Sequence, residues 1–148
     1  MLISVRDLLR LKGDAVWSVQ PNTLVIDALR ELADKDIGAL LVMEAGHIAG
    51  IISERDVVRK TAETGALEPA GTVSEFMTPD VFTISPGQTI EDCMSLMTEQ
   101  RIRHLPVVEG DKLIGMISIG DVVKAIITSQ EFTIEQLTKF IDGGGYNQ

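Results

Sequence analysis

Two short motifs pair a serine with an aspartate three residues later: Ser53-Glu54-Arg55-Asp56 and Ser118-Ile119-Gly120-Asp121. Such a carboxylate can accept hydrogen bonds from two vicinal hydroxyls, as a ribose presents them. The N-terminal turn of a helix also offers backbone N–H groups that favour phosphate. The same residues suit a capping box, in which the serine is the N-cap and the aspartate accepts from the backbone of the serine. For either motif alone, helix capping is a sufficient explanation.

The two motifs belong to a tandem repeat with an offset of 65 residues. From Pro21 to Arg59 the offset holds without a gap, with 12 identities in 39 positions, where ordinary composition gives about two or three. A shared apolar bias does not explain the match, because many of the identical residues are polar or conformationally special: Pro21/Pro86, Asp27/Asp92, Glu44/Glu109, Gly50/Gly115, Ser53/Ser118 and Asp56/Asp121. The chain therefore contains two copies of one supersecondary unit.

Each copy is predicted to contain a short strand, a helix, a β-hairpin and a second helix. The strands precede Pro21 and Pro86, the first helices follow them, and the hairpins come next, at 39–44 with 48–52 and at 104–109 with 113–118. A three-stranded unit of this size buries one face of its sheet, so the second copy must supply cover. The expected fold is α/β (α+β): two pseudo-twofold-related motifs, each a three-stranded sheet with two helices, with a cleft near the axis and additional N- and C-terminal helices.

The repeat includes a leader segment, because Ser4–Leu9 resembles Thr72–Met77 at an offset of 68. The predicted organisation is a first motif with its leader helix at 5–62, a linker at 63–71, a second motif at 72–128, and a C-terminal helix and tail at 129–148. The last helix is expected over Thr133–Asp142, because a Thr-x-x-Gln capping signal opens it and Gly143 follows it.

Composition narrows the classes of function. With 45% apolar residues in 148 the chain can bury a core, and its one cysteine, Cys93, is expected to be a small core residue. No apolar stretch is long enough to span a bilayer, so a cytoplasmic protein without membrane contact is expected. The net charge of −9 argues against nucleic acid. Cations nevertheless cluster after the first motif and before the second hairpin, which suits a small phosphorylated ligand, or else a set of solvated faces.

The sequence shows no constellation for catalysis. His47 lies in a predicted turn and His104 lies beside arginines, with no second ligand at zinc-binding spacing. Neither a Gly-x-Gly-x-x-Gly nor a phosphate-loop motif occurs. We therefore expect a protein that is not an enzyme and holds neither a catalytic cofactor nor a metal.

Taken together, the motifs resemble the tandem cystathionine-beta-synthase (CBS) domain pair, or Bateman module, in its stand-alone form. The resemblance rests on the unit order, the Ser-Val-Gln-Pro and Thr-Ile-Ser-Pro openings, the Arg-Ile-Arg-His-Leu-Pro-Val-Val run and the doubled Gly-h-h-Ser-x-x-Asp motif, where h is apolar. It covers about Val5 to Ile127 and implies regulatory binding of an adenosine nucleotide: AMP, ADP, ATP or, in some members, NAD or S-adenosylmethionine. It also implies a homodimer that signals to a regulated partner protein.

The resemblance also implies roles for individual residues. Asp56 and Asp121, with Ser53 and Ser118, would bind ribose, and Ser18 and Thr83 would face the base or sugar. The other residues of the implied nucleotide-binding site lie at the start of each hairpin and in the first turn of the helix that follows it. They are Ile37, Gly38, Ala39, Leu40, Glu54 and Arg55 in copy one, and Arg101, Ile102, Arg103, His104, Leu105, Pro106, Ile119 and Gly120 in copy two.

The two copies differ at the strand start, where Gly38-Ala39 stands in copy one and Arg103-His104 in copy two. We therefore expect chemically unequal sites, with the phosphate partners Arg55, Arg101, Arg103 and His104. The alternative is a dimeric interaction protein that modulates a partner, for example a redox enzyme, with little or no dependence on nucleotide.

Overall fold

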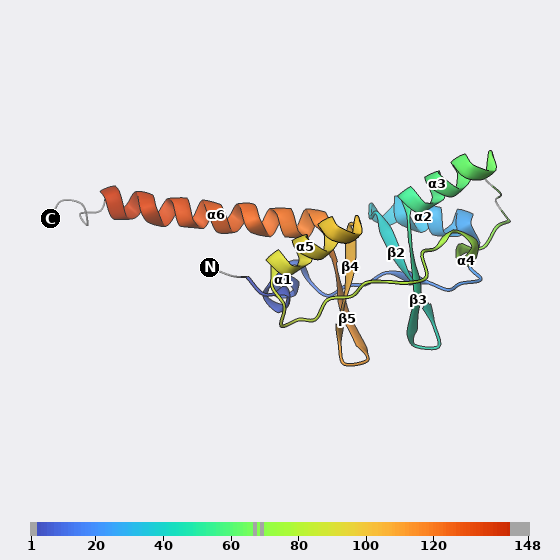
Figure 1. The fold of residues 1–148 in the computed structure, drawn as a ribbon, viewed down its shortest axis with the longest axis horizontal. Coiled ribbons are helices and arrows are strands. Elements are labelled where there is room, and N and C mark those ends of the chain that lie inside the picture. Colours follow the sequence, from blue (N-terminus) through green and yellow to red (C-terminus); the bar gives the residue numbers. More distant parts are fainter. Residues whose placement is uncertain (1–2, 67, 69, 143–148) are drawn as a thin grey trace. The chain divides into compact units, whose positions relative to one another are not determined.

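The computed structural model describes residues 3–66, 68 and 70–142 (Figure 1). The chain divides into two compact units, each built around one copy of the repeat. Ala15–Phe82 form the copy-one unit, and Met1–Asp14 together with Thr83–Gln148 form the copy-two unit.

The copy-one unit is a three-stranded sheet with helices. Its strand order is β1-β2-β3, in which β1 runs parallel to β2, and β2 and β3 form an antiparallel hairpin. Val25, Ala28 and Leu32 give α2 its apolar face, which packs against Leu40 and Ile52 of the hairpin. The elements are β1 (Ser18–Val19), α2 (Val25–Lys35), β2 (Ala39–Glu44), β3 (His47–Ser53), α3 (Glu54–Thr64) and α4 (Val73–Phe76).

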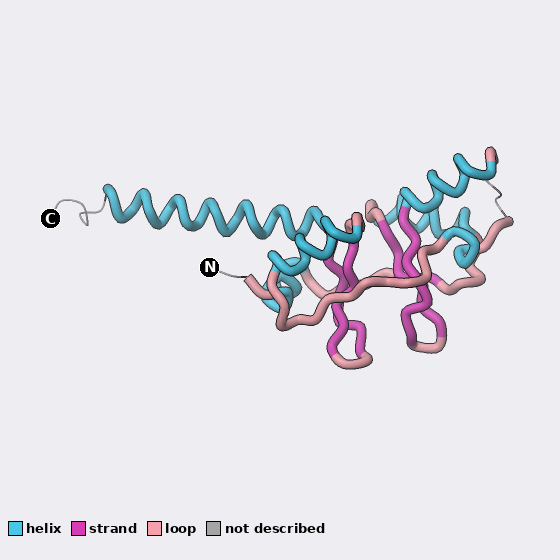
Figure 2. Tube along the Cα trace, viewed as in Figure 1, coloured by secondary structure: helices cyan, strands magenta, loops and turns pink. Residues whose placement is uncertain are grey.

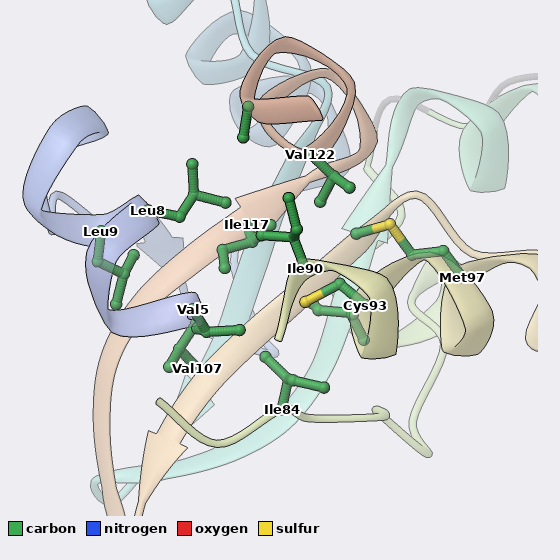
Figure 3. Close-up of a cluster of buried hydrophobic side chains, with 12 residues drawn as sticks. Val5, Leu8, Leu9, Ile84, Ile90, Cys93, Met97, Val107, Ile117 and Val122 are labelled. Atoms are coloured by element: carbon green, nitrogen blue, oxygen red, sulfur yellow. The ribbon is translucent and has the colours of Figure 1, made fainter. Parts of the chain in front are cut away.

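The copy-two unit repeats this plan around a second core. Figure 3 shows Val5 and Leu9 of the first helix packed with Ile90, Cys93 and Val107 from the repeat itself. The elements are α1 (Val5–Lys12), α5 (Ile90–Gln100), β4 (His104–Glu109), β5 (Lys112–Ser118) and α6 (Ile119–Asp142).

The predicted strand before Pro86 is reduced to one isolated parallel bridge, between Ile84 and Val107. In copy one, Leu41 donates its backbone N–H to Trp17 at 3.2 Å and so helps to hold β1. Pro106 occupies the same position in copy two and has no N–H to donate. The second sheet therefore has two strands where three were expected.

The copies share their backbone irregularities as well as their order. Asp36 and Arg101 end the first helices in the left-handed conformation, with φ of 52° and 54°. Each hairpin carries a register shift at the same place, after Val42 and after Val107. The sequence repeat is thus a structural repeat down to its bulges.

The leader segments are exchanged between the copies. Helix α1, which precedes copy one in the chain, docks on copy two, where the N–H groups of Val5 and Arg6 reach the carbonyls of Gln88 (2.8 Å) and Pro86 (3.0 Å). The repeat-related helix α4 docks on copy one in the same way: Val73 donates to Thr23 at 2.8 Å and Ser74 to Pro21 at 3.0 Å. The predicted segments 5–62 and 72–128 are each contiguous in sequence, whereas the copy-two compact unit combines the residues up to Asp14 with those from Thr83 onward.

Two helices run further than predicted. Helix α3 continues through Thr64 and ends at Gly65, whose φ of 81° suits a glycine C-cap, so the predicted linker begins inside a helix. Figure 2 shows α6 as one unbroken helix, of 24 residues. The expected cap at Thr133 is therefore wrong, since its hydroxyl donates to the carbonyl of Ser129 one turn back, at 3.1 Å. The expected end at Gly143 lies outside the described residues.

Cys93 is buried, as is its repeat partner Ala28, and burial, with the nearby charge of Asp92, raises the pKa of the Cys93 thiol to about 11. This confirms that Cys93 is a core residue. Among the helices of the described part of the chain, none combines the length and apolarity needed to cross a bilayer.

Candidate functional site

The two predicted ribose-binding carboxylates lie in the first turns of α3 and α6, where both complete capping interactions. Ser53 donates its N–H to Asp56 Oδ2 at 2.8 Å, and Asp56 returns its own N–H to Ser53 Oγ at 3.2 Å. Ser118 and Asp121 make the same pair of bonds, at 2.9 and 3.2 Å. The capping interpretation is confirmed for both motifs, and it holds each carboxylate in one orientation.

The start of the hairpin is joined directly to the start of the following helix in each unit. In copy one, the N–H of Glu54 donates to the carbonyl of Gly38 at 3.3 Å, and Ala39 is the register partner of Ser53. In copy two the corresponding bond, from Ile119 to Arg103, is 2.8 Å long. The fold therefore brings together the two segments that the sequence predicted to share a site.

The third predicted segment lies on the other side of the same strand. Ser18 in β1 pairs with Leu41 of β2, two residues along from Ala39, and is exposed. Thr83 is exposed directly before Ile84, which is bonded to Pro106 of β4 by a 3.0 Å N–H to carbonyl contact. In both copies, the residue predicted to face a base or sugar thus lies beside the start of the hairpin.

Burial separates the predicted residues into two groups. Leu40 and Leu105 are fully buried in the two cores, so their side chains stabilise the fold and only their backbone is left for a ligand. Ala39 and Pro106 are also buried. The other predicted residues are exposed or partly buried: Ser18, Ile37, Gly38, Ser53, Glu54, Arg55, Asp56, Thr83, Arg101, Ile102, Arg103, His104, Ser118, Ile119, Gly120 and Asp121.

Each carboxylate also has a partner from the exchanged leader segment, which sequence reasoning missed. Lys12 Nζ at the end of α1 lies 2.6 Å from Asp121 Oδ2 and also donates to the carbonyl of Met116 at 2.7 Å. In copy one the partner is neutral: the Thr78 hydroxyl donates to Asp56 Oδ1 at 3.3 Å. No motif marks Lys12 or Thr78, because both contacts arise only from the exchange.

The Lys12 contact changes the electrostatics of copy two. Burial by itself raises the pKa of Asp121, but the hydrogen bonds from Lys12 and Ser118, together with the charge of Lys12, lower it further than burial raises it. The net result is a pKa of Asp121 below its usual value, so this carboxylate is ionised at neutral pH.

Three of the predicted phosphate partners are arginines whose charge is not paired within the described part of the chain. Arg55, Arg101 and Arg103 are exposed, and none of them forms an ion pair with another described residue. Guanidinium groups of this kind can bind phosphate oxygens in a bidentate manner. Over the same residues, no group of three or more His, Cys, Asp or Glu side chains gathers as a metal site.

A small α/β unit that occurs twice, with a capped Ser-x-x-Asp turn beside the start of a hairpin, agrees with a known class of regulatory domain. The CBS domain family matches residues 5–63 and again residues 73–128. The chain therefore belongs to the CBS domain family and carries a tandem pair of these domains.

Individual proteins of the family are similar over nearly the whole chain. The mitochondrial CBS domain-containing protein CBSX3 of Arabidopsis thaliana is 34% identical over 95% of this chain and 73% of its own length. A putative signal-transduction protein with CBS domains from Burkholderia ambifaria is 44% identical, with a TM-score of 0.80 over 88% of this chain and 96% of its own. The crystal structure of CBSX2 in complex with AMP is 28% identical, with a TM-score of 0.70 over 86% of this chain and 98% of its own.

Proposed function

We propose that this CBS pair is a regulatory module that binds an adenosine nucleotide and passes the signal to a partner protein. The observation that carries the proposal is a backbone hydrogen bond that joins the start of each hairpin to the start of the following helix. In copy one it runs from Glu54 to Gly38, and in copy two from Ile119 to Arg103. Each junction joins the helix turn that holds a fixed carboxylate to a strand start, and one exposed arginine belongs to each junction, Arg55 in copy one and Arg103 in copy two. The AMP complex of CBSX2 supports the same class of ligand.

In the proposed binding mode, Asp56 and Asp121 accept hydrogen bonds from ribose hydroxyls. The phosphates lie toward the helix N-termini and the arginines, where the helix dipole and the guanidinium groups favour negative charge. AMP, ADP, ATP and NAD all contain the adenosine portion that this arrangement would recognise. The effector acts without any catalytic step, and it shifts a partner only if it binds one arrangement of the protein better than another.

Calorimetric titration of the wild-type chain with AMP, ATP and NAD tests this proposal. We expect saturable heat with at least one of them, since a ribose diol and a phosphate both find complementary groups. Phosphate alone serves as the control, because it lacks the ribose that the aspartates would bind.

We also propose that the protein forms homodimers through the helices that follow the motifs. Val58 on α3 and Val123 on α6 occupy the same repeat position and are 66% and 44% exposed. Ile127, on the same helix as Val123, is also exposed. We infer that these exposed apolar side chains belong to the association surface.

Sedimentation equilibrium tests the dimer. The wild-type chain is expected at twice its monomer mass, and a Val58→Glu, Val123→Glu variant is expected at the monomer mass, because each glutamate would place a charge in an apolar contact. A wild-type chain that sediments as a stable monomer would contradict the proposal. An interaction protein that modulates a partner enzyme without nucleotide remains the alternative, and the titration above distinguishes the two.

A further inference from the structure

The end of helix α1 supplies copy two with a charge that copy one lacks. Leu9 packs against Gly115 of β5, where an added Cβ would lie 2.7 Å from Leu9 Cδ2, so the helix sits close to the strand. Arg6 adds an ion pair with Glu109 at 2.6 Å. This seating brings Lys12, the last residue of α1, to the carboxylate of Asp121.

The matching segment in copy one takes a different path. Helix α4 ends at Phe76, and Thr78 then pairs with Ile51 of β3 through two backbone hydrogen bonds of 2.8 and 3.0 Å. Pro79 follows, and a residue before proline is disfavoured in the helical conformation. This segment therefore presents only the Thr78 hydroxyl to Asp56, where the matching segment presents an ammonium group to Asp121.

The difference lies in the charge of the groups with which a ligand must compete, because Asp56 accepts only from neutral donors: the Ser53 N–H and hydroxyl at Oδ2 and the Thr78 hydroxyl at Oδ1. Asp121 Oδ2 already accepts from the Ser118 N–H and from Lys12 Nζ. Among the described residues, no hydrogen bond reaches Asp121 Oδ1. A vicinal diol that uses both oxygens must therefore compete with an ammonium group at Asp121, but only with neutral hydroxyls at Asp56, those of Ser53 at 2.9 Å and Thr78 at 3.3 Å.

We propose that Lys12 is a specificity-determining residue of the copy-two site: it competes with ribose hydroxyls for Asp121, so that copy two binds a nucleoside more weakly than copy one. The inference rests on the nucleotide-binding function proposed above. It ties the inequality of the two sites to the exchanged leader helix, in addition to the differing strand starts.

Adenosine is the suitable probe, because it has the ribose without a phosphate that Lys12 could attract. An NMR titration of the full chain can follow the two sites separately, through the amides of Glu54 and Arg55 in copy one and of Ile119 and Gly120 in copy two. For the wild type, the copy-one amides are expected to saturate at lower adenosine concentration than the copy-two amides.

Lys12→Met is expected to tighten adenosine binding at the copy-two amides by about tenfold, since hydrogen bonds to an ionised group are stronger than neutral ones. The copy-one amides should keep their wild-type affinity. Lys12→Gln keeps a long polar side chain without the charge and should give the same gain. Lys112→Met removes an equal charge from the hairpin, away from Asp121, and should change neither site.

Wild-type binding with copy-two affinity unchanged or weakened in both Lys12 variants would overturn the role of Lys12 and leave the proposed function standing. Amides that fail to shift in any variant, the wild type included, would overturn the proposed function and this inference together. A gain in affinity distinguishes the proposal from a purely structural role, since a loosened helix α1 would weaken binding.

Discussion

Replacing Asp56 by asparagine is expected to weaken adenosine-nucleotide binding in copy one by about 10- to 100-fold. A hydrogen bond to an ionised carboxylate contributes about 1.5–3 kcal/mol, and the uncharged amide cannot supply it. The asparagine keeps an oxygen that can accept from the Ser53 N–H, so the helix cap survives. Calorimetry should therefore show a lower affinity for nucleotide, while urea denaturation should show only a small change in the free energy of unfolding.

Asp92→Asn is the matched control, because Asp92 has the same capping role without a place in the proposed site. It accepts from the Thr89 N–H at 3.0 Å and donates to Thr89 Oγ1 at 3.2 Å. The two variants should lose similar, small amounts of stability, and only Asp56→Asn should lose affinity. Equal affinities for Asp56→Asn and the wild type would mean that the motif is a helix cap and nothing more.

Gly50→Ala is expected to destabilise the protein by about 1–3 kcal/mol, the usual cost of forcing an atom into a packed position. A Cβ at Gly50 would lie 2.8 Å from the Thr78 carbonyl oxygen and 2.7 Å from Met77 Sδ. The carbonyl is held by a 3.0 Å hydrogen bond from Ile51, so it cannot retreat without breaking the pairing with β3. Urea denaturation monitored by circular dichroism measures the loss.

Alanine substitutions at two other glycines serve as controls for the stability loss expected of Gly50→Ala. Nothing lies within 4 Å of a Cβ at Gly87, so Gly87→Ala should change stability by less than about 0.5 kcal/mol. Gly115→Ala would meet the end of the Leu9 side chain, which can rotate, and should cost less than Gly50→Ala. A Gly50→Ala protein as stable as Gly87→Ala would contradict the close seating of Thr78 on β3.

The repeat could be predicted from sequence because its signals are local. Pro21, Gly50 and the Ser53-x-x-Asp56 cap each act on neighbouring residues, and their reappearance 65 residues later predicted both hairpins and both helix starts. Register within each hairpin follows from a short turn between apolar strands. The proposed ribose carboxylates were therefore correctly located in the first turns of α3 and α6.

The exchange of leader segments could not be predicted in this way. Ser4–Leu9 and Thr72–Met77 are similar enough that sequence similarity does not show which copy each one covers. The choice depends on packing, such as Leu9 against Gly115, between residues more than a hundred positions apart. The contact between Lys12 and Asp121 follows from that choice. The sequence therefore does not predict Lys12 as a site residue, although it predicts Asp121.

The loss of a strand in copy two has a signal in the sequence. The difference between Leu41 and Pro106 stands out in the aligned copies. The effect of the proline depends on which hydrogen bond the N–H at this position would form. In copy one the Leu41 N–H donates to the carbonyl of Trp17. A missing N–H matters only where a neighbouring strand needs it.

We propose that this CBS pair binds an adenosine nucleotide through its two capped aspartates. The direct test is calorimetric titration of the wild type and of an Asp56→Asn, Asp121→Asn double variant with AMP, ATP and NAD. We expect saturable binding of at least one nucleotide by the wild type, and an affinity at least about tenfold lower in the double variant. Absence of heat at millimolar nucleotide, or equal affinities for the two proteins, would contradict it.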